Sequence, residues 1–172
     1  MCSLALLPQV PAERTSPRNS LSERIVEREI AFHMTVSADR RRIFDALTLP
    51  EYIETWLSLP GDHSDCQTIA SRTDDGYRLE HYHAKGRLDF SISGAYRVCR
   101  RGKLLFTWHK HPAGAETAHT EQSLVSIRIN GAFAESTLLL THTGLFSESD
   151  YDWTRDLWAL SLTKLQTIFS TP

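Results

Sequence analysis

The chain has 172 residues, of which 41% are hydrophobic and 23% charged, which suits one globular domain and excludes disordered and fibrous proteins. Its formal net charge of −2 argues against a nucleic-acid-binding protein, which would normally carry a basic face. No apolar run reaches the ~20 residues of a membrane span, so we expect no membrane span and no nucleic acid as partner.

The first 25 residues are predicted to be a flexible leader, because the stretch from Pro8 to Glu23 is rich in Pro, Ser, Arg and Glu and lacks apolar periodicity. Residues 26–172 are predicted to form the domain. It opens with a half-buried strand over residues 26–36, where apolar and polar side chains alternate. The apolar residues that share one face of this strand are Val26, Ile30, Phe32, Met34 and Val36.

Two short helices are predicted to follow this strand. Ser37 is expected to be the N-cap of the first helix. Thr48 and Glu51 have the spacing of a capping box that starts the second helix, with Pro50 near its first position. The apolar residues expected on the buried faces of the two helices are Ile43, Phe44, Leu47, Tyr52, Ile53, Trp56 and Leu57.

From residue 66 to residue 143 the apolar period changes to two, as in strands. Four glycine-containing dipeptides divide this stretch, and one of them, Asn130-Gly131, is the strongest short hairpin signal. Connections this short predict antiparallel neighbours. Strands are predicted over residues 66–72, 77–84, 88–99, 104–111, 122–130 and 136–143.

The last predicted element is a long helix, capped by Ser149 or Asp150 and apolar on one wide face as far as Phe169. Bulky apolar residues form both edges of that face, whereas Thr154 and Ser161 lie between them. A small, hydroxylated midline of this kind could leave space between the helix and the sheet. In the alternative interpretation, the two hydroxyls bond back to carbonyls one turn earlier.

This order of elements predicts an α+β domain, in which a curved, seven-stranded antiparallel sheet folds around the long helix. A strongly curved sheet and a straight helix do not close without a gap. The architecture therefore predicts an internal cavity between the sheet and the C-terminal helix, of the kind that holds a small molecule.

The order of elements also resembles the START-like, pollen-allergen-like (SRPBCC) helix-grip fold. Four segments are similar to the family named for the activator of the ninety-kilodalton heat-shock chaperone ATPase, and together they extend from about Ile30 to Phe169. They are Val36-Ser37-Ala38-Asp39 with Ile43-Phe44-Asp45-Ala46-Leu47, Pro50-Glu51 and Trp56-Leu57; Ser93-Gly94-Ala95-Tyr96-Arg97-Val98 with Leu104-Leu105-Phe106-Thr107-Trp108; Ser136-Thr137-Leu138-Leu139-Leu140-Thr141-His142-Thr143-Gly144-Leu145; and Trp158 with Leu162 and Leu165.

The resemblance implies a fold more than an activity, because the family includes co-chaperones, ligand carriers and cyclase-like enzymes. A co-chaperone role would imply a chaperone as partner and a part in the stress response. The eukaryotic co-chaperones also carry a separate N-terminal client-binding domain, for which this chain has no room. This difference counts against a direct co-chaperone role.

Two His-x-His pairs, His81-Tyr82-His83 and His109-Lys110-His111, each place two imidazoles on one face of a strand, a spacing that a metal could use. The cupin pattern that such a pair suggests also needs a glutamate and a second histidine motif at set spacings, which this sequence lacks. The cysteines Cys2, Cys66 and Cys99 have no CxxC spacing, so neither a zinc site nor a disulfide framework is indicated. We expect no metal, no cofactor and a cytoplasmic location.

His81 and His142 are in phase with buried apolar residues of their strands and are therefore expected to point inward. Three interpretations stay open for each. The imidazole could hydrogen-bond the polar end of a ligand, act as an acid or base, or be a core residue that backbone groups satisfy.

We therefore predict non-catalytic binding of a small apolar or aromatic molecule, with two alternatives. One is a stress-related modulator of a chaperone ATPase, and the other is a cyclase- or dehydratase-like enzyme that uses His81 or His142. At least two of the four tryptophans are expected to be plain core. The residues predicted to line the pocket are Phe44, Trp56, Tyr77, His81, Tyr96, Trp108, His142, Thr154, Trp158 and Ser161.

Overall fold

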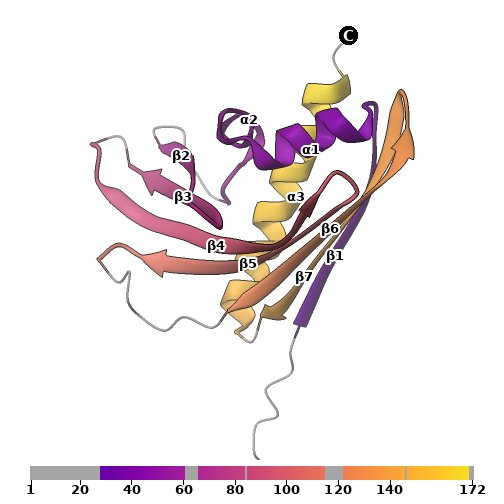
Figure 1. The fold of residues 1–172 in the computed structure, drawn as a ribbon. Coiled ribbons are helices and arrows are strands. Elements are labelled where there is room, and N and C mark those ends of the chain that lie inside the picture. The colour runs from indigo at the N-terminus through magenta and orange to yellow at the C-terminus, as the bar shows by residue number, and fades with distance from the viewer. Residues whose placement is uncertain (1–27, 61–65, 84, 115–121, 146, 171–172) are drawn as a thin grey trace, which may run out of the picture.

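The structure is a computed structural model that describes residues 28–60, 66–83, 85–114, 122–145 and 147–170. The predicted leader over residues 1–25, with Cys2, lies outside the described residues, and so does Val26. Within the described ranges the element order is one strand, two short helices, six strands and one long helix, as predicted. Figure 1 shows the long helix α3 crossing one face of the curved sheet, with α1 and α2 at one end.

All seven strands belong to one antiparallel sheet, ordered β1-β7-β6-β5-β4-β3-β2 (Figure 1). Strands β2 to β7 follow one another through the sheet, and β1 closes it by pairing with β7. The predicted helix-grip architecture is therefore confirmed. The strands span β1 Arg28–Val36, β2 Gln67–Arg72, β3 Gly76–Tyr82, β4 Leu88–Arg100, β5 Lys103–Pro112, β6 Ser123–Ala132 and β7 Glu135–Leu145.

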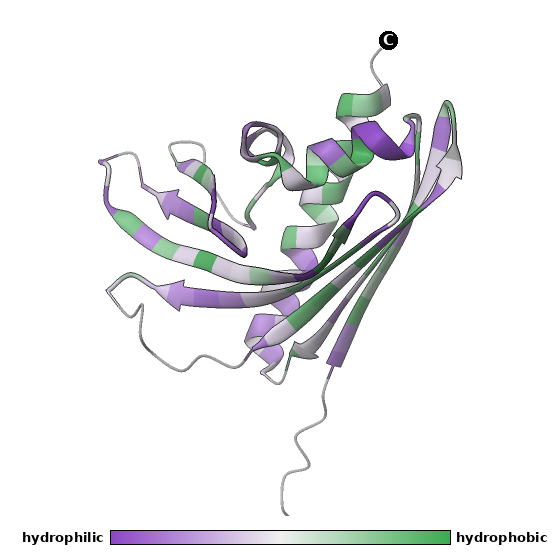
Figure 2. Cartoon of the chain, viewed as in Figure 1, coloured by the Kyte–Doolittle hydropathy of each residue, from purple (hydrophilic) through white to green (hydrophobic). Residues whose placement is uncertain are grey.

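Strand β1 buries the face that its alternation predicts. Ile30 and Val36 are buried, whereas Glu29, His33 and Thr35 are exposed. The same alternation appears as hydrophobic and hydrophilic bands along the strands in Figure 2. Because successive side chains point to opposite faces of a sheet, one face of the sheet is apolar and receives α3.

Helix α1 spans Arg40–Thr48, and its N-cap is Asp39 rather than the predicted Ser37. The Asp39 carboxylate accepts hydrogen bonds from the backbone N–H groups of Arg41 and Arg42, at 2.8 and 2.9 Å. These two bonds, that from Arg42 first, and the positive charges of Arg42 and Arg41 lower the pKa of Asp39. Ser37 lies two residues too early, because the chain first makes a tight turn in which the Ala38 N–H bonds to the Val36 carbonyl.

Helix α2 spans Pro50–Trp56, and the predicted capping box is wrong. The Thr48 hydroxyl donates to the Phe44 carbonyl at 2.8 Å, inside α1, and is therefore not available to α2. Leu49 is the N-cap and makes no side-chain capping bond, while Pro50 starts the helix as predicted. A proline at this position needs no N–H partner, so the helix begins without a polar cap.

The β6–β7 hairpin turns later than the Asn130-Gly131 signal predicts. Gly131 still pairs with Ser136 inside the ladder, so the turn lies at Phe133, which has a φ of 59°. Gly131 is needed for another reason. A Cβ there would lie 2.5 Å from the Glu135 carbonyl oxygen, and the residue has a φ of 138°.

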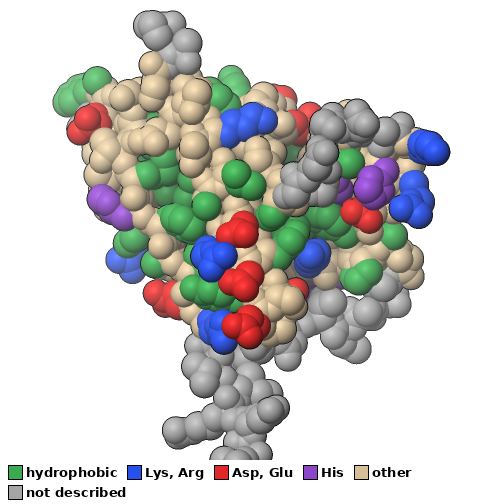
Figure 3. Space-filling model, turned by 180° about the vertical axis from the view of Figure 1, so that it is seen from behind, with side chains coloured by type: hydrophobic (Ala, Val, Ile, Leu, Met, Phe, Trp, Pro, Cys, Tyr) green, Lys and Arg blue, Asp and Glu red, His purple; other side chains and the backbone are tan. Residues whose placement is uncertain are grey.

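Helix α3 spans Glu148–Ser170 and carries the main apolar face that covers the sheet. Its amino-terminal cap is the Ser147 hydroxyl, which accepts the Asp150 N–H at 3.0 Å, rather than Ser149 or Asp150. Acidic and basic side chains follow one another on the outer side of the molecule, as Figure 3 shows. On α3, Arg155 pairs with Asp152 and Asp156. None of the helices within the described ranges is long and apolar enough to cross a membrane.

Candidate functional site

Most of the predicted pocket aromatics form one packed cluster between the sheet and α3. The ring of Tyr77 on β3 lies 5.8 Å from Tyr96 on β4 and 6.3 Å from Trp108 on β5, measured between centroids. Trp108 in turn lies 5.2 Å from Trp158 of α3. Aromatic rings at these separations are in direct contact. This part of the interior is therefore filled by the protein's own side chains.

The phenols of this cluster are neutral groups. Burial raises the pKa of Tyr96 to about 12 and raises that of Tyr77 well above its usual value. The Tyr77 hydroxyl donates a hydrogen bond to the Thr107 carbonyl at 2.9 Å. Tyr77 is thus fixed by the protein itself and is poorly placed to bind a ligand through its oxygen.

His142 is fully buried on β7 and is held by a chain of hydrogen bonds. The indole Nε1–H of Trp158 donates to Nδ1 of His142 at 3.0 Å, so Nδ1 carries no proton. Nε2–H then donates to the Ser123 hydroxyl at 2.7 Å, and that hydroxyl donates to the Trp108 carbonyl at 3.1 Å. Burial lowers the pKa of His142 to about 3. His142 is therefore a satisfied core histidine, but the side chains of Trp158 and Ser123 satisfy it rather than the backbone groups of that interpretation.

Ser161 lies on the midline of α3, as predicted, but the space next to its hydroxyl is occupied. The Ser58 N–H donates to Oγ of Ser161 at 2.9 Å, and Oγ donates back to the Ser58 carbonyl at 3.1 Å. Neither interpretation of the sequence foresaw this contact. The small side chain of Ser161 admits the backbone that follows α2, and the pair of bonds fastens that backbone to α3.

A cavity of about 260 Å³ opens beside this contact, between α2, β2, β3 and α3. His81 is 3% exposed and presents its imidazole to the cavity, with Nδ1 3.4 Å from the Thr68 hydroxyl. Phe90 packs against the same imidazole, with 5.1 Å between ring centroids. The residues that line the cavity are Glu54, Leu57, Ser58, Leu59, Cys66, Thr68, His81 and Lys164.

A smaller cavity of about 170 Å³ lies between α1, α2 and the carboxyl end of α3. Trp56 lines it, but the indole N–H donates to the Ala46 carbonyl at 2.8 Å, so its polar edge is already used. Arg42 lies 5.4 Å from the ring of Phe169 in a cation–π contact at the rim. The residues that line this cavity are Arg42, Asp45, Ala46, Tyr52, Thr55, Trp56, Leu165, Ile168 and Phe169.

The predicted site residues therefore fall into separate places. His81 lines the larger of these cavities, and Trp56 lines the smaller one. Phe44 is a partly buried residue that packs against the core, and Thr154 is buried on α3. The remaining predicted residues that come together in the ring cluster are Tyr77, Tyr96, Trp108, His142 and Trp158.

Several lining residues of the larger cavity were not predicted. Thr68 could have been found, because it pairs directly with His81 in the β2–β3 register and therefore shares its face. Lys164 lies one turn after Ser161 and could also have been found from helical spacing. Ser58 and Leu59 follow α2 in a stretch without periodicity, and no sequence pattern indicates their place.

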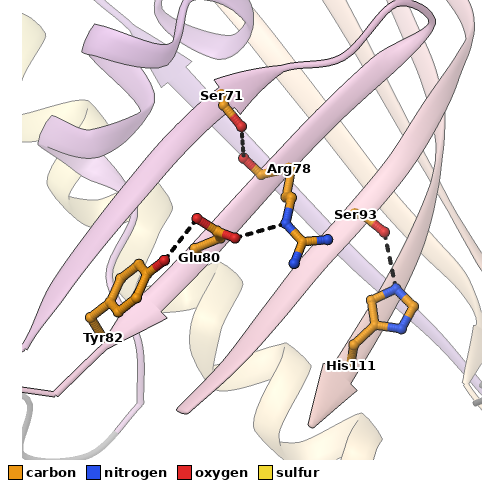
Figure 4. A network of polar contacts seen from close by, with 6 residues as sticks. All are labelled: Ser71, Arg78, Glu80, Tyr82, Ser93 and His111. Atoms are coloured by element: carbon orange, nitrogen blue, oxygen red, sulfur yellow. Dashed lines mark hydrogen bonds and ion pairs between the residues drawn. The ribbon is translucent and has the colours of Figure 1, made fainter. Parts of the chain in front are cut away.

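The two His-x-His pairs have different surroundings. His109 and His111 stack with 6.0 Å between ring centroids, and Nε2 of His111 lies 3.0 Å from the Ser93 hydroxyl. Figure 4 shows His111 and Ser93 on the sheet beside the network of Ser71, Arg78, Glu80 and Tyr82. Among the described residues, no three His, Cys, Asp or Glu side chains are placed to hold one metal ion.

Polar side chains of β3 form a network of their own. Arg78 pairs with Glu80 at 2.9 Å, and Glu80 accepts a hydrogen bond from the Tyr82 hydroxyl at 3.0 Å (Figure 4). These contacts lower the pKa of Glu80 and raise that of Tyr82. Successive residues of β3 point to opposite faces of the sheet, so Glu80 faces away from the cavity that His81 lines.

Comparison with known proteins places this geometry in a family. The fold is similar to that of the AHSA1 protein from Silicibacter pomeroyi, with a TM-score of 0.66, 16% identity, and 83% of this chain and 98% of that chain covered. A protein from Chromobacterium violaceum has a TM-score of 0.64 and 16% identity, with 84% of this chain and 99% of that chain covered. CalU16 from Micromonospora echinospora has a TM-score of 0.56 and 19% identity, with 85% of this chain and 78% of that chain covered. None of the curated proteins matches the chain.

The family resemblance inferred from the four sequence segments is confirmed by the match of residues 37–170 to a single family model. That range contains α1, α2, strands β2 to β7 and α3, and so includes every residue that lines the two cavities. The chain belongs to the family described as "Activator of Hsp90 ATPase homolog 1-like protein".

Proposed function

We propose that the protein binds a small molecule non-covalently in the cavity between α2, β2, β3 and α3. The observation that carries this proposal is a buried imidazole, His81, at the wall of a cavity that reaches the surface. A buried polar group that faces a cavity fixes the orientation of a ligand, while the apolar part of the ligand supplies the affinity.

The size of the cavity limits the ligand. A volume of about 260 Å³ exceeds the ~150 Å³ of an engineered apolar cavity that holds benzene, and falls below the ~300 Å³ at the small end of common ligand pockets. The ligand that fits is a compact molecule of one or two rings. A long acyl chain does not fit this space.

The chemistry of the wall refines the expected ligand. Leu57 and Leu59 supply apolar surface, whereas Thr68 and His81 supply hydrogen-bonding groups. Lys164 at the exposed rim adds a positive charge that favours an anionic or strongly polar substituent. We therefore favour an aromatic molecule with one polar end over the wholly apolar ligand that the sequence also allows.

The enzymatic alternative receives no support at His142. A general acid or base works best when its pKa lies near the pH of the reaction, and the pKa of His142 is about 3. Both of its ring nitrogens are also engaged, by Trp158 and by Ser123. Ligand binding at His81 needs no such proton transfer.

The test measures the binding of 1-naphthol, a two-ring aromatic with one hydroxyl. Binding is monitored through the fluorescence of 1-naphthol. Thr68→Trp fills the cavity, and we expect it to weaken binding at least tenfold. Ile69→Trp is the matched control, because Ile69 is exposed on the opposite face of the same strand, and its affinity is expected to stay unchanged. Equal binding by the unmodified protein and Thr68→Trp would overturn the proposal.

A role as modulator of a chaperone ATPase stays a prediction from family membership, and the cytoplasmic location stays a prediction from the cysteine pattern. The test is the ATPase rate of the cognate chaperone with and without the purified protein. A rate that does not change at saturating protein removes this alternative and leaves the ligand-binding proposal standing.

A further inference from the structure

A thiol and two side chains that can activate it lie in line at the edge of the larger cavity. Sγ of Cys66 lies 3.5 Å from Nδ1 of His83, and Nε2 of the same imidazole lies 3.5 Å from Oδ1 of Asp89. Cys66 lines the cavity. A nucleophile, a base and a carboxylate that orients the base, in this order, form the arrangement that nucleophilic catalysis uses.

The fold sets this arrangement through the strand register. Gln67 pairs with Tyr82, so Cys66 and His83 are the next residues on each side of the same β2–β3 ladder. The backbone of His83 is held by two bonds, from its own N–H to the Arg87 carbonyl and from the Gly86 N–H to its carbonyl. The turn that returns the chain then brings Asp89 to the far side of the imidazole.

The three groups do not converge on one point, which separates this arrangement from a metal site. The thiol and the carboxylate contact opposite nitrogens of the His83 ring. The Asp89 carboxylate favours a proton on Nε2, which leaves the Nδ1 lone pair directed at Cys66. His83 can therefore accept the thiol proton, and the carboxylate stabilises the imidazolium that results.

We propose that Cys66 is an activated thiol that adds to ring-sized α,β-unsaturated carbonyl compounds held in the cavity. The proton of the thiol moves to Nδ1 of His83, and sulfur forms a bond to the β-carbon of the enone. The electron pair of the C=C bond moves onto the carbonyl oxygen, giving an enolate. The proton on Nδ1 then passes to the α-carbon, so every atom ends in the adduct and His83 is neutral again.

Cys99 provides an internal comparison within the same protein. It is the other cysteine among the described residues, it lies on β4, and burial raises the pKa of its thiol. The charge of Arg72 opposes that shift only in part. Cys99 is therefore expected to react more slowly than Cys66, even though the residue is more exposed.

The experiment compares two full-length single-cysteine proteins, Cys2→Ser with Cys99→Ser and Cys2→Ser with Cys66→Ser. Alkylation by iodoacetamide at pH 7 is followed by intact mass spectrometry. An ordinary thiol is only a few per cent ionised at this pH, so activation can raise the rate by up to about 30-fold. We expect Cys66 to react about tenfold faster than Cys99.

Variants of the base test the mechanism in the Cys66-only protein. His83→Gln is expected to abolish the rate advantage, and Asp89→Asn to reduce it, with circular dichroism showing that each variant is folded. Asp89→Asn, which keeps His83, provides the test if His83→Gln does not fold. Equal rates for Cys66 and Cys99, or a Cys66 rate that neither substitution changes, would overturn the proposal.

The choice of electrophile rests on the proposed ligand cavity, and the activation of the thiol does not. With 2-cyclohexenone as probe, Thr68→Trp is expected to slow adduct formation at Cys66, while Ile69→Trp leaves it unchanged. If Thr68→Trp does not change the rate of adduct formation, the proposal that the cavity holds the electrophile is overturned. If 1-naphthol fails to bind but the iodoacetamide difference persists, the proposed function fails and the activated thiol stands.

Discussion

The indole N–H of Trp158 donates a hydrogen bond to Nδ1 of His142 at 3.0 Å, which joins α3 to β7 of the sheet. An indole can only donate, so this bond requires an unprotonated Nδ1. Protonation of His142 would place two N–H groups against each other in a buried site. The packed core therefore requires His142 to be neutral.

This relationship predicts how stability depends on pH. The pKa of His142 is about 3 in the folded protein, below the ~6.5 of an unfolded histidine, so the contribution is present above pH 6.5 and is lost as the pH falls toward 3. Between pH 7.5 and pH 5 the loss amounts to about 2 kcal/mol. Urea denaturation at the two pH values measures it.

His142→Gln is the control for this prediction, because it keeps hydrogen-bonding groups but cannot titrate. We expect its free energy of unfolding to fall about 2 kcal/mol less than that of the unmodified protein over the same pH range. Other groups titrate equally in both proteins and cancel. Identical pH dependence of the two would show that His142 does not carry the effect.

Ser161→Ala tests the contact between α3 and the segment after α2. It removes both hydrogen bonds to the Ser58 backbone and leaves a partly buried N–H and carbonyl without this partner, so we expect a loss of about 1–3 kcal/mol. Thr163→Ala is the matched control on the same helix, since the Thr163 hydroxyl is exposed and bonds within α3. Its effect should stay within about 0.5 kcal/mol in urea denaturation.

The fold was predictable because apolar periodicity is a local property of the sequence. The alternation from Ile30 to Val36 predicts β1, and the wide apolar face that reaches Phe169 predicts α3. The cavity wall was less predictable because it depends on contacts between distant segments. Ser58 and Ser161 are 103 residues apart, and nothing in either stretch indicates that they meet.

The two buried histidines, His81 and His142, also show what sequence periodicity cannot predict. Strand phase predicts that His81 and His142 both point inward, and both are buried. Phase cannot tell that one lines a cavity while the other is enclosed by Trp158 and Ser123. The difference at His142 is set by α3 and β6, which contribute Trp158 and Ser123 from elsewhere in the chain.

Asp39→Ala tests the corrected start of α1. The carboxylate accepts two backbone N–H bonds, and its loss is expected to cost about 1 kcal/mol of unfolding free energy, as is typical of N-caps. Ser37→Ala, at the position that the sequence favours, should change stability by less than about 0.5 kcal/mol. Thermal or urea unfolding of the two variants measures the difference. The reverse order would restore Ser37 as the cap.

Gly94→Ala tests the close approach of β4 and β5 beneath the ring cluster. A Cβ at this position would lie 1.7 Å from the Thr107 carbonyl oxygen and 2.9 Å from the Tyr77 hydroxyl, which bond to each other. Neither the backbone nor the buried phenol can move aside cheaply, so we expect a loss above about 3 kcal/mol or failure to fold.

Gly86→Ala is the control for that substitution, because both replace a glycine by the same residue. Gly86 has a φ of 71°, but a Cβ there would meet no atom within 4 Å, so only backbone strain of about 1–2 kcal/mol is expected. Soluble yield and urea denaturation compare the two variants. If Gly94→Ala is no less stable than Gly86→Ala, the two strands are not as close at Gly94 as the structure has them, and the anchoring of Tyr77 to Thr107 fails with that contact.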